Sequence, residues 1–181
     1  MKKNRTAPFL LACIFLFLCA CESDEGDMET PDPDVVGFNI NVSGDFSRNM
    51  QGTNAYYRFQ ELPASLTTTH QLSIYLTDGE GYTVTAIIGV NGESTPPPGN
   101  YPALNLTGNG YNGDDPSTST FLFGQNGGIS HSSNLQGQGG LSITATSDGL
   151  LSGSLETPLV PTDNGSGNIL VNGTFTAEFR P

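Results

Sequence analysis

The amino-acid sequence predicts an all-β protein, an antiparallel β-sandwich of about nine strands, with a closed or partly open β-barrel as the alternative. Apolar and polar residues alternate with a period of two in several segments between residues 35 and 181. No segment of this region keeps the 3.6-residue periodicity of a helix, and glycine, proline, asparagine and aspartate separate the alternating runs. One polar face per strand is typical of antiparallel sheets that are covered on one side only.

Each expected strand has its apolar residues at alternate positions, with polar residues between them. The pattern is clearest at residues 36–42, 72–77, 82–90, 141–146 and 169–179. Weaker strands are expected at residues 55–60, 103–107, 119–124 and 151–156. Proline cannot donate a hydrogen bond to a neighbouring strand, so residues 96–98 mark a loop, and the glycine-rich run at 108–116 marks another.

The hydrophobic register predicts one turn in detail. A hairpin loop formed by Asp148 and Gly149 alone would put the apolar residues of its two strands on opposite faces. A three-residue loop at 147–149 instead pairs Ala145 with Leu151 and Ile143 with Gly153. We therefore expect the three-residue loop, with Gly149 at positive φ closing a G1 bulge.

Residues 1–20 have the features of a secretory signal. Lys2, Lys3 and Arg5 are cationic, and no charged residue follows until the signal ends. The apolar run from Phe9 to Ala20 would span about 18 Å as a helix, whereas a bilayer core needs about 30 Å. We therefore prefer a cleaved signal to a permanent membrane span.

The signal ends in Leu18-Cys19-Ala20-Cys21, which resembles the bacterial lipobox. The resemblance implies that Cys21 becomes the mature N-terminus, and that diacylglycerol and acyl chains such as palmitate attach it to a membrane. Cys13 follows a similar motif, but cleavage there would leave too short an apolar run. Cys19 fits less well because the bulky Leu18 precedes it. The mature chain then keeps no cysteine for a disulfide or for thiol catalysis.

Residues 21–34 are expected to form the lipidated cysteine and a disordered acidic tether. Seven of the thirteen residues from 22 to 34 are acidic and two are proline, which leaves too little apolar surface for folding. The tether begins with Glu22, Ser23, Asp24 and Glu25, which resemble the surface-export signal of Bacteroidota lipoproteins. We expect the cell outer membrane, with the domain exposed on the surface in preference to the periplasmic face.

The charge of the mature chain excludes one class of partner. Removal of the signal leaves 18 acidic residues against three arginines, Arg48, Arg58 and Arg180, so the formal net charge is −15. Nucleic-acid binding requires cations against the phosphates, and this chain lacks them. Electrostatic adhesion to anionic lipid is disfavoured for the same reason, so membrane attachment must come from the lipid anchor.

Short motifs in the second half of the domain carry a family resemblance. They are the runs at residues 141–144, 152–155 and 171–175, and the turn Pro98-Gly99-Asn100-Tyr101. With them the chain resembles small, uncharacterised, β-rich lipoproteins of Bacteroidota. The resemblance implies a β-rich domain without a known activity, and no functional residues follow from it.

The sequence contains no catalytic motif. The histidines are His70 and His131, and no Gly-x-Ser-x-Gly elbow accompanies them. We interpret both as exposed polar residues, with His131 in a flexible polar segment. A glycoside hydrolase requires two carboxylates across a cleft, and the sequence singles out no pair among its acids. The acids considered are Glu61, Glu80, Glu93, Glu156 and Glu178.

Calcium is the metal that the sequence favours most, although we expect no cofactor. Asp163 and Asn164 lie in one predicted turn, and Asp114 and Asp115 lie in another. Both pairs offer the oxygen ligands that calcium prefers, but neither has EF-hand spacing. Stabilisation of turns by their own side chains is therefore the preferred interpretation. Zinc is disfavoured because the mature chain has no cysteine and only two separated histidines.

Tyrosines are the candidates for ligand contact. Tyr101 and Tyr111 flank the glycine-rich loop, where exposed rings could stack on a sugar. We prefer the interpretation that they pack these loops onto the sheet, and keep sugar stacking as the alternative. Tyr56 and Tyr57 are adjacent in an expected strand, so they must point to opposite faces.

Together these observations predict a lipoprotein with a non-catalytic binding or accessory domain that contacts a glycan or an envelope protein. A secreted hydrolase with paired carboxylates and a structural envelope component are the alternatives. The boundaries are residues 1–20 for the signal, 21–34 for the lipidated tether and 35–181 for the single domain.

Overall fold

The computed structural model describes residues 35–64, 66–104, 116–133, 138–163 and 167–181, and these contain eleven strands. The strands are β1 (Gly37–Gly44), β2 (Arg48–Gly52), β3 (Ala55–Glu61), β4 (His70–Thr77), β5 (Tyr82–Val90), β6 (Gly99–Pro102), β7 (Ser119–Gln125), β8 (Gly128–Ser133), β9 (Gly140–Ser147), β10 (Leu150–Pro161) and β11 (Ile169–Phe179).

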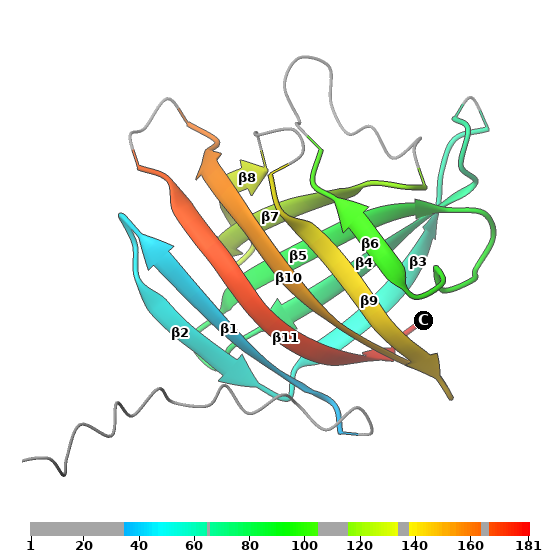
Figure 1. Cartoon of the computed structure of the whole chain (residues 1–181), viewed down its shortest axis with the longest axis horizontal. Coiled ribbons are helices and arrows are strands. Elements are labelled where there is room, and N and C mark those ends of the chain that lie inside the picture. Colours follow the sequence, from blue (N-terminus) through cyan, green and yellow to red (C-terminus); the bar gives the residue numbers. More distant parts are fainter. Residues whose placement is uncertain (1–34, 65, 105–115, 134–137, 164–166) are drawn as a thin grey trace, which may run out of the picture.

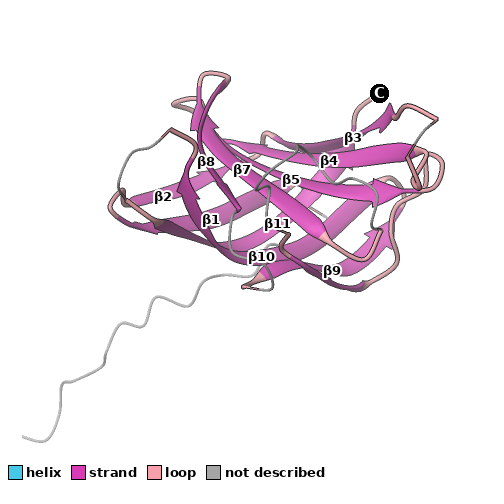
Figure 2. Ribbon diagram, turned by 90° about the horizontal axis from the view of Figure 1, so that it is seen from above, coloured by secondary structure: helices cyan, strands magenta, loops and turns pink. Residues whose placement is uncertain are grey.

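All eleven strands belong to one mixed, mostly antiparallel sheet with the order β2-β1-β11-β3-β4-β5-β7-β8-β10-β9-β6. An additional pairing between β10 and β11 makes part of this sheet a ring. In Figure 1, β2, β1, β11, β10, β9 and β6 form a front layer, and β3, β4, β5 and β7 cross behind it. Figure 2 shows the same two layers from above.

The all-β, mostly antiparallel architecture is confirmed, but the two layers are not separate sheets. The parallel pairing of β11 with β3 at Glu178–Tyr56 and Phe179–Tyr57 joins them on one side. The antiparallel pairing of β10 with β8 at Leu159–Ser133 through Pro161–His131 joins them on the other. Both joins are possible because β10 and β11, with 12 and 11 residues, are long enough to reach past their own layer. Strands that pass from one layer to the next are typical of orthogonally packed sheets.

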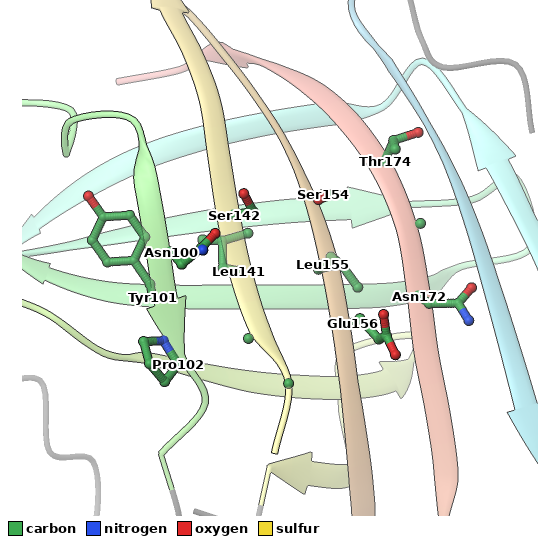
Figure 3. Close-up of a pocket in the computed structure, with 13 residues that line it drawn as sticks. Asn100, Tyr101, Pro102, Leu141, Ser142, Ser154, Leu155, Glu156, Asn172 and Thr174 are labelled. Carbon is green, nitrogen blue, oxygen red and sulfur yellow. The ribbon is translucent and has the colours of Figure 1, made fainter. Parts of the chain in front are cut away.

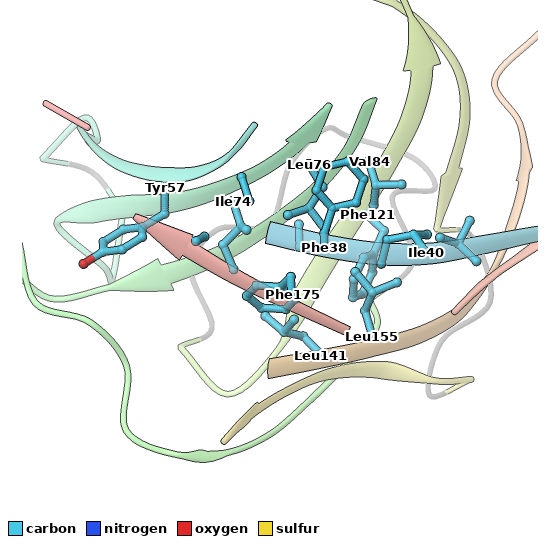
Figure 4. Close-up of a cluster of buried hydrophobic side chains, with 14 of the residues drawn as sticks. Phe38, Ile40, Tyr57, Ile74, Leu76, Val84, Phe121, Leu141, Leu155 and Phe175 are labelled. Atoms are coloured by element: carbon cyan, nitrogen blue, oxygen red, sulfur yellow. The ribbon is translucent and has the colours of Figure 1, made fainter. Parts of the chain in front are cut away.

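The core lies between the two layers (Figure 4). The expected alternation places the apolar residues inward, as in β1, where Phe38, Ile40 and Val42 are buried. Phe175 of β11 is 2% exposed and lies close to Gly153 of β10. The largest fully buried side chains come from both layers and are Phe121, Phe175, Ile40, Met50, Leu72, Ile74, Leu76, Ile88, Leu141, Ile143, Leu151 and Leu159.

The predicted three-residue hairpin between β9 and β10 is wrong at the turn. Asp148 and Gly149 both have positive φ, 47° and 82°, as in a two-residue type I′ turn. Ala145 therefore faces Ser152, but the register shifts before Gly153, which pairs with Ile143 as expected. A bulge in the strand, rather than a longer loop, brings the apolar positions back to one face.

Three strands, β2, β6 and β8, were not predicted from the sequence. β2 has a single large apolar residue, Met50, and β8 is mostly glycine and serine, so neither shows clear alternation. The segment around His131 is thus a strand that pairs with β7 and β10, and not the expected flexible segment. The turn expected at Pro98–Tyr101 is wrong, because Gly99–Pro102 form β6. Of the strand expected at 103–107, Ala103 makes an isolated bridge to Ser119, and residues 105–107 lie outside the described residues.

Candidate functional site

A groove of about 750 Å³ lies on the outward face of the front layer, over β6, β9, β10 and β11. We call it the polar groove. Figure 3 shows its lining residues, which include neighbouring side chains from adjacent strands. Its polar side chains are Asn100, Ser142, Ser154, Glu156, Asn172 and Thr174.

The strand register explains why these side chains gather. Asn100 of β6 pairs with Ser142 of β9, which pairs with Ser154 of β10, and Ser154 pairs with Thr174 of β11. Because side chains at paired positions lie on the same face, the four residues form one row across four strands. Glu156 and Asn172 are also paired and lie in the next row. Neighbouring strands are about 4.8 Å apart, so the row extends about 14 Å.

A glycine allows β6 to come close enough to complete this groove. A Cβ atom at Gly140 would lie 2.5 Å from the carbonyl oxygen of Tyr101 and 3.0 Å from the Cα of Pro102. Both contacts are with backbone, which cannot move away as a flexible side chain can. Gly140 therefore makes β6 the fourth strand of the site.

One side-chain oxygen among the described groove residues is buried and unpaired. Within the described part of the chain, the Oδ1 atom of Asn172 is buried and has no hydrogen-bond partner. Leaving such an acceptor unpaired costs about 1–3 kcal/mol. A contribution to stability therefore does not explain why an asparagine occupies position 172. Its side chain lines the same groove as polar side chains from three other strands.

The groove carries little charge. Among its lining residues in the described chain, Glu156 is the sole ionisable acid, and there is no arginine, lysine or histidine. Such a surface suits a neutral partner rich in hydroxyl or amide groups, because an anion would find no cation to pair with.

Tyr101 supports the groove from beneath. Its ring is 7% exposed, its hydroxyl donates to the carbonyl oxygen of Pro97 at 2.6 Å, and its own carbonyl accepts from the hydroxyl of Ser119 at 2.6 Å. Burial raises the pKa of Tyr101 above its ordinary value. Tyr101 is thus buried and fixes the proline-containing loop to β6, in agreement with the preferred interpretation that it packs this loop onto the sheet.

Several other candidates lie outside the described residues. They are Cys21, Glu22, Ser23, Asp24, Glu25, Tyr111, Asp114, Asp115 and Asn164. The remaining calcium candidate, Asp163, is exposed at the end of β10. A search of the described residues finds no group of three or more potential metal ligands among His, Cys, Asp and Glu.

The histidines are not brought together. His70 begins β4, and its Nδ1 lies 3.0 Å from the hydroxyl of Thr69. His131 is in β8, its Nδ1 lies 2.9 Å from the hydroxyl of Ser130, and its ring packs 6.0 Å from that of Phe123. These local contacts give no arrangement of nucleophile and base.

The strongest ionic contacts are distant from the polar groove. Arg48 of β2 contacts Asp78 at 2.8 Å and Glu80 at 3.1 Å in the turn between β4 and β5. Burial alone would favour the protonated form of Asp78. The hydrogen bond from Arg48 and those from the backbone N–H groups of Tyr82 and Glu80 outweigh it, so the pKa of Asp78 is lowered. This contact connects the front layer to the rear layer.

A second ion pair lies at the end of β11, where Glu178 contacts Arg180 at 2.7 Å.

Of the polar side chains in the groove, the sequence had singled out Glu156 alone as a candidate, as one of five acids available for a catalytic carboxylate pair. The alternation placed Ser142 and Thr174 on polar faces, but it could not show which strands are neighbours. Asn172 and Ser154 become part of a site only through the pairing of β10 with both β9 and β11.

Comparison of the chain with models of protein families, with curated proteins and with solved structures found no match. In the described residues, no helix is long and apolar enough to cross a membrane.

Proposed function

We propose that this protein is a lipid-anchored binding module of the bacterial cell envelope, which holds a neutral glycan in the polar groove and performs no catalysis. The observation that carries the proposal is the row of Asn100, Ser142, Ser154 and Thr174 across four strands. Hydroxyl and amide groups at regular spacing can donate to and accept from the hydroxyls of a sugar chain.

The charge of the groove supports a neutral ligand. Its lining holds one carboxylate and no cation among the described residues. A ligand with phosphate or sulfate groups would meet repulsion from Glu156 and from the excess of acidic residues in the domain. A neutral sugar chain avoids this repulsion and can use Glu156 as a hydrogen-bond acceptor.

The alternative of a hydrolase with paired carboxylates has less support. Glycoside hydrolysis uses two acids on either side of the bond that is cleaved. Glu156 lines the polar groove without a second acid among the described lining residues. Its neighbours are the Asn172 amide and serine and threonine hydroxyls. These groups can form hydrogen bonds with a sugar, but they cannot act as the second catalytic carboxylate.

For the architecture, we propose a two-layer arrangement between a sandwich and a barrel. The layers pack face to face as in a sandwich, and the short β11–β3 and β8–β10 pairings join their sides as in a barrel. The outward face of each layer is then free to bind a ligand.

The location of the module follows from the proposed anchor at Cys21. An acidic tether of residues 22–34 would hold the domain away from the membrane, with the outer membrane surface as the site of action. Proteolysis of intact cells tests this part of the proposal. We expect the domain to be cleaved without lysis, and cleavage only after lysis would contradict surface display.

A glycan array probed with residues 22–181 tests the ligand. We expect binding to neutral glycans that is lost in Ser154→Tyr, because the larger side chain fills the middle of the polar row. The matched control is Ser43→Tyr, which places the same side chain at an outward position of β1 outside the groove. A blank array, or equal binding by both variants, would contradict glycan binding at this site.

A further inference from the structure

A second hollow of about 320 Å³ lies on the outward face of the rear layer. We call it the tyrosine slot. Tyr56 and Tyr75 line one side, and Ile129 of the β7–β8 hairpin lines the other. Three strand spacings separate Tyr75 on β4 from Ile129 on β8, about 14 Å along the sheet. The slot is on a different set of strands from the polar groove, so the two are separate sites.

The tyrosine wall is held in place before any ligand binds. Tyr56 and Tyr75 occupy paired positions on β3 and β4, and their rings stack with centroids 5.0 Å apart and an interplanar angle of 17°. The Cζ atom of Arg180 lies 4.6 Å from the centre of the Tyr56 ring. Arg58 donates to the Tyr75 hydroxyl at 3.1 Å. Because the rings are already ordered, a ligand that stacks on them loses little affinity to side-chain ordering.

The floor of the slot combines hydroxyl and apolar groups. The hydroxyls of Thr77 and Thr83 lie 3.0 Å apart, and Thr85 follows two positions along β5. Leu122 adds apolar surface from β7, and Ile129 is 55% exposed. A pyranose ring has matching properties, since its C–H face is apolar and its hydroxyls project from the edge. Stacking on tyrosine and hydrogen bonding to threonine would occur together.

A cation stands at the edge of this slot. In the part of the chain that the structure describes, Arg48 and Arg180 form ion pairs with carboxylates, whereas Arg58 forms none. Arg58 shares a cross-strand row with Ile87, which lines the slot, because both pair with Ser73. Its Cζ atom lies 5.1 Å from the centre of the Tyr75 ring. The guanidinium group is thus placed to donate hydrogen bonds to the carboxylate of a ligand that stacks on Tyr75.

We propose that the tyrosine slot binds a sugar acid, with the pyranose ring against Tyr75, the hydroxyls on Thr77 and Thr85, and the carboxylate on Arg58. The proposal does not rest on the function of the polar groove. It gives the two faces different ligands: neutral sugars on the front layer and an acidic sugar on the rear layer. An acidic domain would bind such a ligand only where a cation is free to pair with it.

Isothermal titration of the mature chain with a galacturonic acid oligomer tests this inference. The mature chain carries Cys21→Ser, and Ser154→Tyr is added to exclude the polar groove. The matched ligand is the same oligomer after methyl esterification, which keeps the ring and removes the charge. We expect the acid to bind about tenfold more tightly than the ester, in line with one charge-assisted contact.

Variants of Arg58 and Tyr75 test which side chains contact the ligand. Arg58→Gln should lower the affinity for the acid about tenfold, and that for the ester by a clearly smaller factor, because the ester loses only the support that Arg58 gives to Tyr75. Arg180→Gln removes the same charge from an arginine that is already paired with Glu178, and should have a smaller effect. Tyr75→Ala should abolish binding of both ligands, and its near-ultraviolet circular dichroism checks the fold. The chain has no tryptophan, so tyrosine fluorescence gives a second binding signal.

Absence of binding by the acid would overturn the proposal. Equal affinity for acid and ester would overturn the role of the carboxylate. If Arg58→Gln and Tyr75→Ala both stay folded and both bind the acid with unchanged affinity, the acid binds elsewhere, and the slot is overturned as the site.

Discussion

The two outward faces of the molecule share one curled sheet but differ in the side chains they present. The polar groove is formed by short, neutral hydrogen-bonding residues such as Ser142 and Ser154. The tyrosine slot has stacked rings, threonine hydroxyls and a nearby arginine. Inward positions are alike in both layers, since both contribute aliphatic and aromatic residues to one core.

The outward positions of the strands thus set the chemistry of each face without disturbing the fold. An inward change would affect both faces because the core is shared. An outward change should affect one face and leave the other intact.

Removal of a shared core side chain should damage both faces together. Phe175 is buried between the layers and touches the region of Gly153. We expect Phe175→Ala to lower the free energy of unfolding by about 3–5 kcal/mol, because it leaves a cavity. Denaturant unfolding measures this loss. A change below about 1 kcal/mol would contradict the assignment of Phe175 to a shared core.

A Cβ atom at Gly140 should damage the polar groove alone. The contacts with the backbone of Tyr101 and Pro102 would push β6 away from β9. We expect Gly140→Ala to cost up to about 3 kcal/mol and to remove glycan binding, while the galacturonic acid oligomer still binds. Gly79→Ala is the control, since a Cβ there meets nothing within 4 Å. Equal losses in both variants would refute the close approach of β6.

The contact of Arg48 with Asp78 should stabilise the join between the layers in a pH-dependent way. We expect Asp78→Asn to cost about 2 kcal/mol at neutral pH, from the loss of a charge-assisted hydrogen bond. Because the pKa of Asp78 is lowered in the folded state, its carboxylate stabilises the fold above its ordinary pKa of 3.8, and this stabilisation disappears as the pH falls through the lower folded value.

Denaturant unfolding of both proteins between neutral and acidic pH measures this effect. The difference between wild type and Asp78→Asn should shrink below pH 3.8. Glu80→Gln is the control, because its carboxylate is 70% exposed although it contacts the same arginine. We expect it to cost less than about 0.5 kcal/mol. A pH-independent difference for Asp78→Asn would contradict the ionic contribution.

The tyrosine hydroxyls of the two faces should differ in their contribution to stability. The Tyr101 hydroxyl bonds to Pro97 from a ring that is 7% exposed, whereas the Tyr75 hydroxyl bonds to Arg58 at an exposed position. We expect Tyr101→Phe to cost about 1 kcal/mol and Tyr75→Phe less. Thermal unfolding compares them, and the reverse order would contradict the supporting role of Tyr101.

The all-β class and most strand positions were predictable from the sequence, because inward-facing positions of a strand need apolar residues at every second residue. Phe38, Ile40 and Val42 illustrate this rule. It failed for β2 and β8, whose stability comes from pairing with neighbours rather than from their own pattern. It also failed at the β9–β10 turn, where the bulge before Gly153 corrected the register at a distance from the loop.

Neither site could be assembled from the sequence. Ser154 and Asn100 share one row only because β9 lies between β10 and β6. Local alternation does not determine this strand order. The outward position of Tyr56 opposite Tyr57 was predictable, and Tyr57 is indeed the buried one at 3% exposure. Its stacking with Tyr75 depends on the pairing of β3 with β4, which links residues 19 positions apart.

The most direct test of the account is a titration of the mature domain with a neutral glycan from the array, followed by the backbone amide signals in NMR spectra. If the neutral glycan binds in the polar groove, the signals of Asn100, Ser142, Ser154 and Thr174 move together with one affinity, while those of Tyr56, Tyr75 and Thr85 stay in place. Shifts confined to the tyrosine slot, or spread evenly over both faces, would contradict binding in the polar groove.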